Sequence, residues 1–358
     1  EQIQKSNFYP RSVHMGYYLT GAVFLKLFNI PDIYALNMMN CALGGAAAGI
    51  IYLITLGLCR RQLPSVSAAL LLTVNWIFLK NSVYAEVYTP RTFFLLLAIL
   101  LWIYNKTALS AFSFLWSFLI STSSLFALPV FFIIRPDKKK LLIFTLIFVI
   151  SAAAFILPVY KTYFFGARGL LVGIKGDLAK IKTLAVYRPS DVKWALIKEG
   201  KELLGGFYAA LPMIAAGVFL MLRKRKYRPL AAAFTCLWAV SFVLGEKFYD
   251  FAIQLPLYAL LCASFGIFLA HAGKKNNLRI TLPVLILTAA GVLTSAITNK
   301  PEYIVSAVHP SLLKILLLIF CLTTGIALLL RHKTAALSAI TAFIIITNGV
   351  FATKKITV

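Results

Sequence analysis

The sequence predicts an all-α fold, a polytopic membrane helical bundle, on three observations. Hydrophobic residues make up 61% of the 358 residues and charged residues 13%, and the mean hydropathy is +0.86, far above what a soluble core of this length needs. The apolar tracts are mostly continuous, which favours spanning helices over the alternating strands of a barrel. Basic residues cluster between these tracts.

The apolar tracts set the expected order of helices. A membrane helix needs about 17 to 25 apolar residues, and tracts of about this length lie at 35–59, 64–82, 90–105, 141–160, 206–222, 229–245, 251–270, 279–297, 311–330 and 335–352. The tract 106–135 is too short for two full spans and a turn, and both of its ends are basic. We therefore expect a pair of short or broken helices there, with the turn at Ser121–Ser124.

Clusters of Arg and Lys predict which helix ends face the cytosol. They are Arg60–Arg61, Lys106, Arg135 with Lys138–Lys140, Arg223–Arg228, Lys274–Lys275 with Arg279, and Arg331 with Lys333. With each cluster cytosolic, the spans alternate consistently from residue 35 onward, and only Lys354–Lys355 opposes the rule. The chain then divides into an extracytosolic loop 1–34, a transmembrane core 35–160, an extracytosolic basic loop 161–205 and C-terminal transmembrane helices 206–358.

Two outward segments are expected to lie along the membrane surface. Both flanks of Gly16–Phe28 face outward and the segment is too short to cross, which predicts an interfacial helix. In the loop 161–205, apolar residues recur at helical spacing, so we expect two short interfacial helices that either bind substrate or rest on anionic lipid. The chain opens on the polar residues Glu1–Asn7 without a signal peptide, so a first membrane helix is expected upstream.

The pattern of charges and cysteines argues against several function classes. A formal charge of +25 suggests nucleic acid as partner in a soluble protein, but here the charges lie between apolar tracts, where they orient helices and meet lipid headgroups. The five cysteines occur singly, so neither a metal site nor a disulfide framework is predicted. Walker, HExxH and GxSxG motifs are absent, which leaves ATP-driven transport and the common hydrolase chemistries without support.

Acidic residues are scarce, so each of the 11 is informative. Glu86 lies where one predicted span ends and the next begins, and an ionisable group at the membrane edge is a functional candidate. The alternative is a salt bridge to Arg91 that anchors the helix start. A second outward cluster holds Lys247 and Asp250, for which ordinary loop charges are an equal alternative. His14 is either a substrate contact or a structural hydrogen-bonding residue.

Three motifs follow one another in the first part of the chain. They are His14-Met15-Gly16-Tyr17 opening a short helix, a small-residue-rich span with Asn37 and Asn40 that ends in Arg60–Arg61, and a span closing on Ala85-Glu86-Val87-Tyr88. This order resembles the protein O-mannosyltransferase-like branch of the GT-C glycosyltransferases. The specific similarity covers residues 1–130, and weaker similarity extends to Leu115–Pro129 and Phe248–Tyr258.

The resemblance implies a GT-C-like bundle that moves a sugar, mannose among the candidates, from a polyprenyl-phosphate donor to a protein, lipid or glycan acceptor. It implies catalytic carboxylates at Glu86 and at Glu1, which falls near the end of an acidic first-loop motif whose principal acid is expected upstream. Ser121–Ser124 stands where relatives often carry an Asn-His pair, which leaves the acceptor type open. No cofactor is expected, and a bound divalent cation stays an open alternative.

The chemistry of such a transfer needs the same kinds of residue. Attack of an acceptor hydroxyl on an anomeric carbon needs a carboxylate base, and a phosphate leaving group needs cations. Arg91 ranks first among the outward cations because it lies near Glu86 and because Arg binds phosphate in a bidentate way. The expected substrate-contacting residues are His14, Tyr17, Tyr88, Arg91, Arg11, Arg188, Lys247 and Asp250.

This interpretation predicts a location and partners. The protein is expected in a bacterial inner membrane with its site facing the periplasm or cell exterior, and its partners are the lipid-linked sugar, membrane lipids and the acceptor. A multi-pass transporter or lipid flippase is the main alternative, although such proteins tend to show internal repeats and charges deep in the bilayer. A membrane scaffold is the third class, and it leaves the order of the motifs unexplained.

Overall fold

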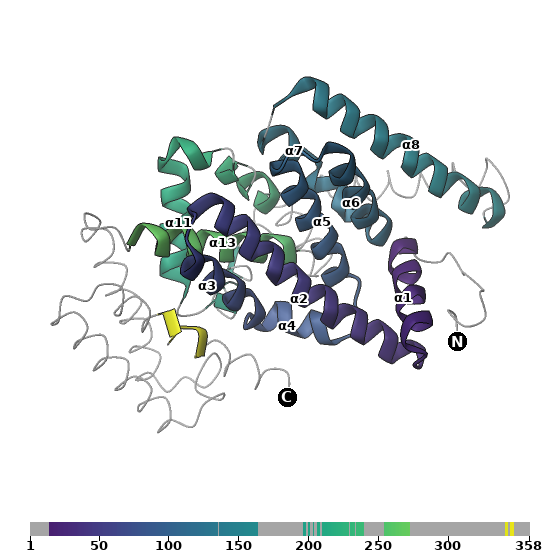
Figure 1. Cartoon of the computed structure of the whole chain (residues 1–358), viewed down its shortest axis with the longest axis horizontal. Coiled ribbons are helices and arrows are strands. Elements are labelled where there is room, and N and C mark those ends of the chain that lie inside the picture. The colour runs from purple at the N-terminus through teal and green to yellow at the C-terminus, as the bar shows by residue number, and fades with distance from the viewer. Residues whose placement is uncertain are drawn as a thin grey trace. The chain divides into compact units, whose positions relative to one another are not determined.

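The structure is a computed structural model that describes residues 14–134, 136–163, 210–228, 230–232, 234–239 and 254–272, with a few helical residues at 196–197, 200, 203, 206–207, 341–342 and 344–346. Within these residues every regular element is a helix and none is a strand (Figure 1). The all-α prediction is therefore confirmed for the described part of the chain. The predicted spans 279–297, 311–330 and 335–352 and the loop 161–205 lie largely outside it.

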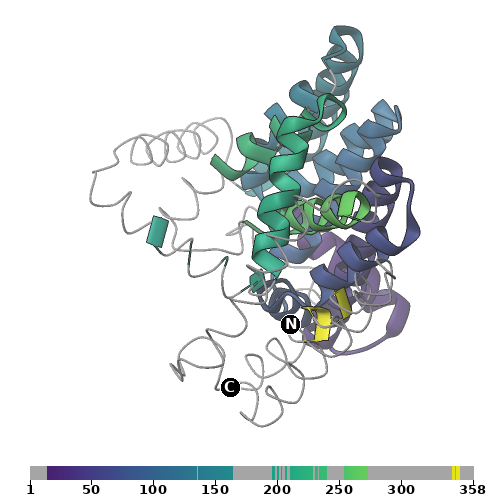
Figure 2. The ribbon, with the colours of Figure 1, turned by 90° about the vertical axis from the view of Figure 1, so that its left-hand side faces the viewer.

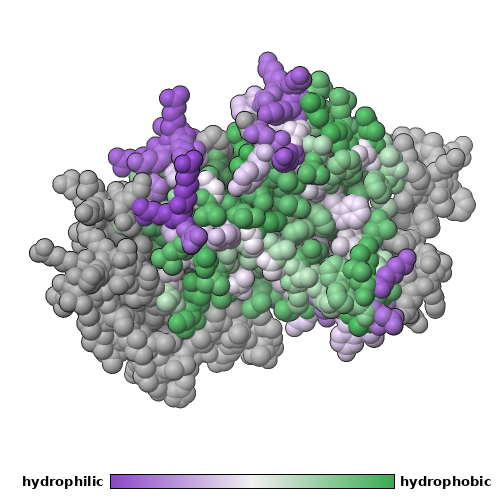
Figure 3. Space-filling model, viewed as in Figure 1, coloured by the Kyte–Doolittle hydropathy of each residue, from purple (hydrophilic) through white to green (hydrophobic). Residues whose placement is uncertain are grey.

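Three of the described helices are long and apolar enough to cross a membrane. They are α2 (Asp32–Cys59), the Lys138–Ile156 part of α8 (Lys138–Tyr163) and α13 (Leu255–Ala272). They match the predicted spans 35–59, 141–160 and 251–270, and their length and composition indicate a membrane protein. On the face drawn in Figure 3, apolar residues cover most of the described surface, and hydrophilic side chains gather in a few groups.

The predicted span 64–82 is wrong as a single helix. It forms α3 (Gln62–Thr73) and α4 (Trp76–Val83), which are bent by 63° at the break. Asn75 occupies this break, where its Oδ1 accepts from the backbone N–H of Phe78 at 3.0 Å and its Nδ2 donates to the carbonyl of Gly206 at 2.9 Å. Because the Asn75 side chain caps a new helix, the backbone ladder stops at Val74 although its neighbours are apolar.

The shorter helices largely follow the sequence pattern. The predicted interfacial segment is α1 (Met15–Phe28), and α5 (Tyr88–Ile103) covers the tract 90–105. The expected broken pair over 106–135 is confirmed as α6 (Thr107–Ile120) and α7 (Leu128–Ile134), joined by the 3-10 helix η1 (Thr122–Ala127) at the serine turn. In the tract 206–222 the continuous helix α11 covers Leu211–Arg223, and a helix over Leu230–Ala239 falls in the tract 229–245.

The chain forms two compact units. Unit 1 comprises Glu1–Ile50, Asn81–Glu199 and Ala232–Leu257, and unit 2 comprises Ile51–Lys80, Gly200–Ala231 and Tyr258–Val358. In unit 2, α11 and α13 cross closely (Figure 2). A Cβ on Gly217 would overlap the backbone of Ser264. The Ser264 hydroxyl donates to the carbonyl of Ile214 on α11 at 3.3 Å. Glycine at 217 is therefore what allows these two helices to touch.

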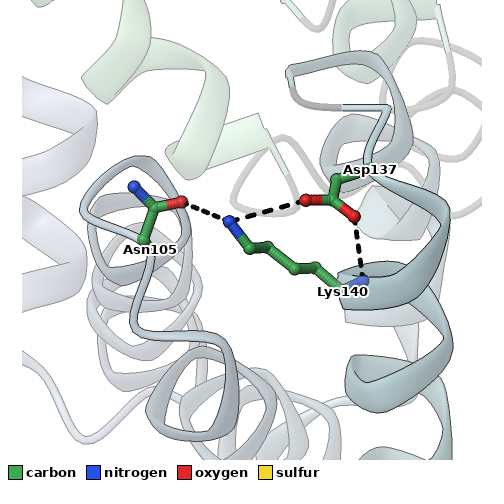
Figure 4. Close-up of polar contacts among 3 residues, drawn as sticks. All are labelled: Asn105, Asp137 and Lys140. Carbon is green, nitrogen blue, oxygen red and sulfur yellow. Dashed lines mark hydrogen bonds and ion pairs between the residues drawn. The ribbon is translucent and has the colours of Figure 1, made fainter.

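In unit 1, α5 and α6 form an antiparallel hairpin (Figure 1). The hairpin turns at Asn105, which has a left-handed φ of 62°, and the N–H of Lys106 donates to the carbonyl of Leu101 at 2.8 Å. The Nζ atom of Lys140 in α8 donates to Asn105 Oδ1 at 2.9 Å and forms an ion pair with Asp137 at 3.5 Å (Figure 4). A helix end closed in this way needs no further partner.

Aromatic side chains fill the core between α5, α6, α7 and α8. Ring centroids of Trp102, Phe114, Phe131 and Phe144 lie 4.8–5.9 Å apart, mostly edge to face. This spacing is the favourable one for aromatic pairs. These aromatic contacts hold the two helices of the hairpin together. Basic residues lie at its Asn105 turn, and the start of α5 and the end of α6 lie at its opposite end.

Candidate functional site

The described candidate residues gather at the end of unit 1 where α5 begins and α6 ends. The loop Tyr84–Val87 leads into α5, and α6 returns antiparallel to α5, so its last turn lies at the same end. Helix α1 contacts this end of α6. The structure brings together His14, Tyr17, Glu86, Tyr88 and Arg91, whereas Glu1, Arg11, Arg188, Lys247 and Asp250 lie outside the described residues.

The loop Tyr84–Val87 is held by a buried asparagine of α2. Asn40 is fully buried, and its Nδ2 donates to the carbonyls of Tyr84 at 2.5 Å and Glu86 at 2.7 Å, with a longer contact of 3.4 Å to the carbonyl of Asn81. All three partners are acceptors, so the amide nitrogen must face the loop. The backbone that carries Glu86 is therefore anchored to α2.

Glu86 supplies the carboxylate of this site and is exposed. It precedes the first residue of α5, Tyr88, where the N–H groups of a first helical turn lack intrahelical partners and carry partial positive charge. A carboxylate is electrostatically favoured at that position. Its exposure makes it accessible to a ligand, so its candidacy rests on position and anchoring, not on the burial penalty expected from the sequence.

Tyr17 of α1 lies beside Glu86. Its side chain is 4% exposed and packs with Met39 of α2 and Ile120 of α6. Burial raises the pKa of the Tyr17 phenol, and the Glu86 carboxylate raises it further, an effect that falls off with distance. Within the described part of the chain, the buried hydroxyl has no hydrogen-bond partner. A neutral phenol with an unused donor is suited to a sugar hydroxyl or a phosphate oxygen.

Three contacts dock α1 on the last turns of α6. The Nδ1 atom of His14 lies 2.6 Å from the carbonyl of Ile120, and Trp116 Nε1 donates to Thr20 Oγ1 at 2.9 Å. A Cβ on Gly16 would meet the backbone of α6 at 3.0 Å, so a larger residue there would push α1 away from α6. Because the partner of Nδ1 is a carbonyl, Nδ1 carries the hydrogen and Nε2 is the acceptor of the neutral ring. One nitrogen of His14 is thus structural.

Arg91 is buried in the first turn of α5, with 2% of its surface exposed. Its Nη1 donates to Ser123 Oγ at 2.5 Å, and its guanidinium carbon lies 5.7 Å from the centre of the Tyr88 ring. A buried cation is costly unless polar or anionic groups meet it. The contact with Ser123 defines the orientation of the guanidinium, which the sequence had related only to Glu86.

The serine turn is a hydrogen-bonded group of hydroxyls as well as a helix break. Ser117 Oγ donates to the carbonyl of Arg91 at 3.0 Å and lies 2.7 Å from Ser124 Oγ. Ser121 Oγ lies 2.8 Å from Ser123 Oγ. Both the backbone and the side chain of Arg91 are therefore tied to α6 and η1.

These groups together can bind an anion and accept a proton. A guanidinium is a strong donor to phosphate oxygens, and the hydroxyl of the half-exposed Ser123 lies against the guanidinium of Arg91, while the exposed Glu86 carboxylate can accept a proton from a hydroxyl. Across the described ranges, no group of three His, Cys, Asp or Glu side chains could hold a metal ion.

The roles of Asn40 and Ser123 were missed by reasoning from the sequence. Asn40 was noted only as part of a motif, and Ser123 only as part of a turn. The available signal was a polar amide inside an otherwise apolar span, since buried polar groups are normally hydrogen-bonded. What the amide binds depends on which loop folds against α2, and the sequence does not carry that information locally.

Comparison of the chain with protein-family models, with curated proteins and with solved structures gave no match.

Proposed function

We propose that this protein is a membrane glycosyltransferase of GT-C type, which transfers a sugar from a polyprenyl-phosphate donor to a protein, lipid or glycan acceptor. The anchoring of Glu86 by Asn40 is the observation that carries the proposal. A fully buried amide that binds the backbone on both sides of Ala85 fixes the loop from which the exposed Glu86 carboxylate extends, and such fixed, exposed carboxylates suit ligand binding. The same end of unit 1 also holds the His-x-Gly-Tyr motif that suggested the family.

In the proposed reaction, the acceptor hydroxyl oxygen forms a bond to the anomeric carbon of the donor sugar. The bond between that carbon and the phosphate oxygen breaks, polyprenyl phosphate leaves as an anion, and the hydroxyl proton passes to a carboxylate. Arg91 and the Ser123 hydroxyl stabilise the charge on the leaving phosphate. Glu86 has a supporting role in this scheme: it binds and orients the donor or acceptor beside Tyr17 and the second nitrogen of His14.

The proposal extends to the location of the site. We infer that Glu86, His14 and Arg91 face the outside of a bacterial inner membrane, where lipid-linked sugars are used. Within unit 1, the length of α5 separates Glu86 from Lys106 and the Lys138–Lys140 cluster, which supports opposite sides for these groups under the positive-inside rule.

The test is sugar transfer by a Glu86→Gln variant of the full-length protein in nanodiscs. A radiolabelled polyprenyl-phosphate mannose and its glucose counterpart are offered with hydroxylated peptide and lipid acceptors. Loss of a group that orients a bound substrate can cost about 100-fold in rate, whereas an exposed structural carboxylate contributes only about 1 kcal/mol or less to stability. We expect transfer to fall about 100-fold with unchanged thermal stability.

Asp137→Asn is the matched control, because it neutralises an exposed carboxylate at the far end of the α5–α6 hairpin. It should leave transfer at the wild-type rate. Equal turnover by wild type and Glu86→Gln would remove Glu86 from the site, and absence of transfer by the wild type with any lipid-linked sugar would count against the enzyme proposal.

A transporter or lipid flippase is the second candidate, and the bent pair α3–α4 favours it. Broken helices often line substrate paths in transporters because their free ends can bind ions. Here the break is occupied by Asn75, whose amide is used to cap α4 and to bind Gly206, so the bend has a structural explanation. Reconstituted vesicles that move a fluorescent polyprenyl phosphate without any sugar transfer would favour this candidate.

A further inference from the structure

Unit 2 contains a separate cluster of positive charge, built from three segments far apart in the sequence. Lys226 Nζ donates to the carbonyl of Leu58 at 2.8 Å, and Arg61 Nη1 donates to the carbonyl of Ala270 at 3.2 Å. Tyr227 is buried between them, with its hydroxyl 3.4 Å from the same Leu58 carbonyl and its ring edge-on to His271. The last turns of two candidate membrane spans, α2 and α13, therefore fix this cluster in place.

Among the described residues of unit 2, no acidic side chain balances this charge. The carbonyls at the ends of α2 and α13 account for Lys226 and Arg61, because helix C-termini favour cations. Five further cations are exposed, and we call the whole set the basic cluster: Arg60, Arg61, Arg223, Lys224, Arg225, Lys226 and Arg228. Like charges held together at this density repel one another, so an anion from outside the chain would stabilise the fold.

Exposed apolar residues adjoin the basic cluster. Phe219 and Leu222 lie in the last turn and a half of α11, just before Arg223, and Leu63 lies in the first turn of α3, just after Arg61; their side chains are 55%, 52% and 51% exposed. A soluble anion or a nucleic acid would use the cations alone. A phospholipid uses both surfaces, because its phosphate meets the cations and its acyl chains cover the apolar side chains.

We propose that the basic cluster binds the headgroup phosphate of an anionic phospholipid, whose acyl chains lie along Leu63, Phe219 and Leu222. The position of the cluster at the ends of α2 and α13 matches the height at which headgroups lie. This site is independent of the proposed sugar transfer, and it ties three segments of unit 2 together through one ligand.

The experiment measures lipid binding by the full-length protein in a mild non-ionic detergent, by native mass spectrometry and thermal denaturation. Phosphatidylglycerol is compared with phosphatidylcholine of the same chain length and with inorganic phosphate. The test variant is K224Q/R225Q/R228Q, which spares the two cations that bond to helix ends. The control K106Q/K138Q/K139Q removes the same charge at the start of α6 and α8.

Each Lys or Arg near a membrane surface contributes about 1 kcal/mol to the binding of anionic lipid. Loss of three of them should therefore weaken phosphatidylglycerol binding about 100-fold relative to wild type. The control should keep nearly wild-type affinity, and added salt should weaken binding by the wild type. Three outcomes would overturn the proposal: equal loss in the control, equal binding of phosphatidylcholine, or stabilisation by inorganic phosphate as strong as that by the lipid. A folded test variant that retains full affinity would do so as well.

Discussion

Removal of the Asn40 amide should loosen the loop that carries Glu86. Asn40→Ala deletes two short hydrogen bonds, to the carbonyls of Tyr84 and Glu86. A buried hydrogen bond contributes about 1 kcal/mol net, and a carbonyl left buried without a partner costs about 1–3 kcal/mol. Both hydrogen bonds are only partly buried, so the lower figure applies to each. We expect a loss of about 2 kcal/mol.

Two measurements separate local from global loosening. Unfolding in mixed micelles with an increasing fraction of denaturing detergent gives the change in free energy. Hydrogen exchange of the peptide covering Tyr84–Val87 gives local opening, which should increase because the Glu86 N–H bonds within this loop at 2.8 Å. Exchange in the aromatic core around Phe114 should stay unchanged.

Asn37→Ala is the matched control, three residues earlier on the same helix. Among the described residues its Oδ1 is buried without a hydrogen-bond partner, so its removal should change stability by less than about 0.5 kcal/mol. The reasoning fails if Asn37→Ala destabilises the protein as much as Asn40→Ala does, or if Asn40→Ala leaves both the unfolding free energy and the exchange of the loop unchanged.

Three further predictions concern packing, pH and topology. Gly16→Val should destabilise the protein by about 1–3 kcal/mol in the same unfolding assay, because its Cβ meets the α6 backbone at 3.0 Å. Gly45→Ala is the control: its Cβ would lie in open space, so the change should be neutral or stabilising by up to about 1 kcal/mol. The Lys140 backbone N–H lowers the pKa of Asp137 in the folded protein. The ionised carboxylate therefore stabilises the fold fully above the unfolded-state pKa of about 3.9, and this stabilisation is lost as pH falls through the folded-state pKa. Asp137→Asn should reduce the fall in unfolding free energy between about pH 5 and 3, and an unchanged pH dependence would contradict the assignment. In a cysteine-free background, single cysteines at positions 86 and 225 should be labelled from opposite sides of the membrane, and labelling of both from the same side would refute the topology.

Hydropathy predicted the helices well and their breaks less well. The tract 35–59 appears as α2 and the tract 90–105 as α5, because the backbone N–H and C=O groups of an apolar segment in lipid must form hydrogen bonds with one another. The same argument failed at 64–82. One asparagine at 75 replaces the ladder with a side-chain cap, and an average over some twenty residues hides a single polar side chain.

The candidate residues could be proposed from the sequence, but their contacts could not. Glu86 and Arg91 stood out because charges are scarce in this chain, and His14 and Tyr17 stood out through a motif. Their partners come from elsewhere in the sequence: Asn40 from α2 for the Glu86 loop, and Ser123 from η1 for Arg91. Each partner is an ordinary polar residue whose role depends on what lies opposite it.

By itself, the sequence determined the all-α class, the membrane environment and the order of most helices, because hydrophobicity and helical length are local properties of a segment. Tertiary structure alone decided that α1 docks on α6, that Asn40 holds the Glu86 loop, that Lys226 bonds to the end of α2 and that Arg61 bonds to the end of α13. These contacts join residues from 46 to 209 positions apart. The physical reason is that a hydrogen bond needs two partners at about 3 Å, and only the packed fold determines which distant partners come that close.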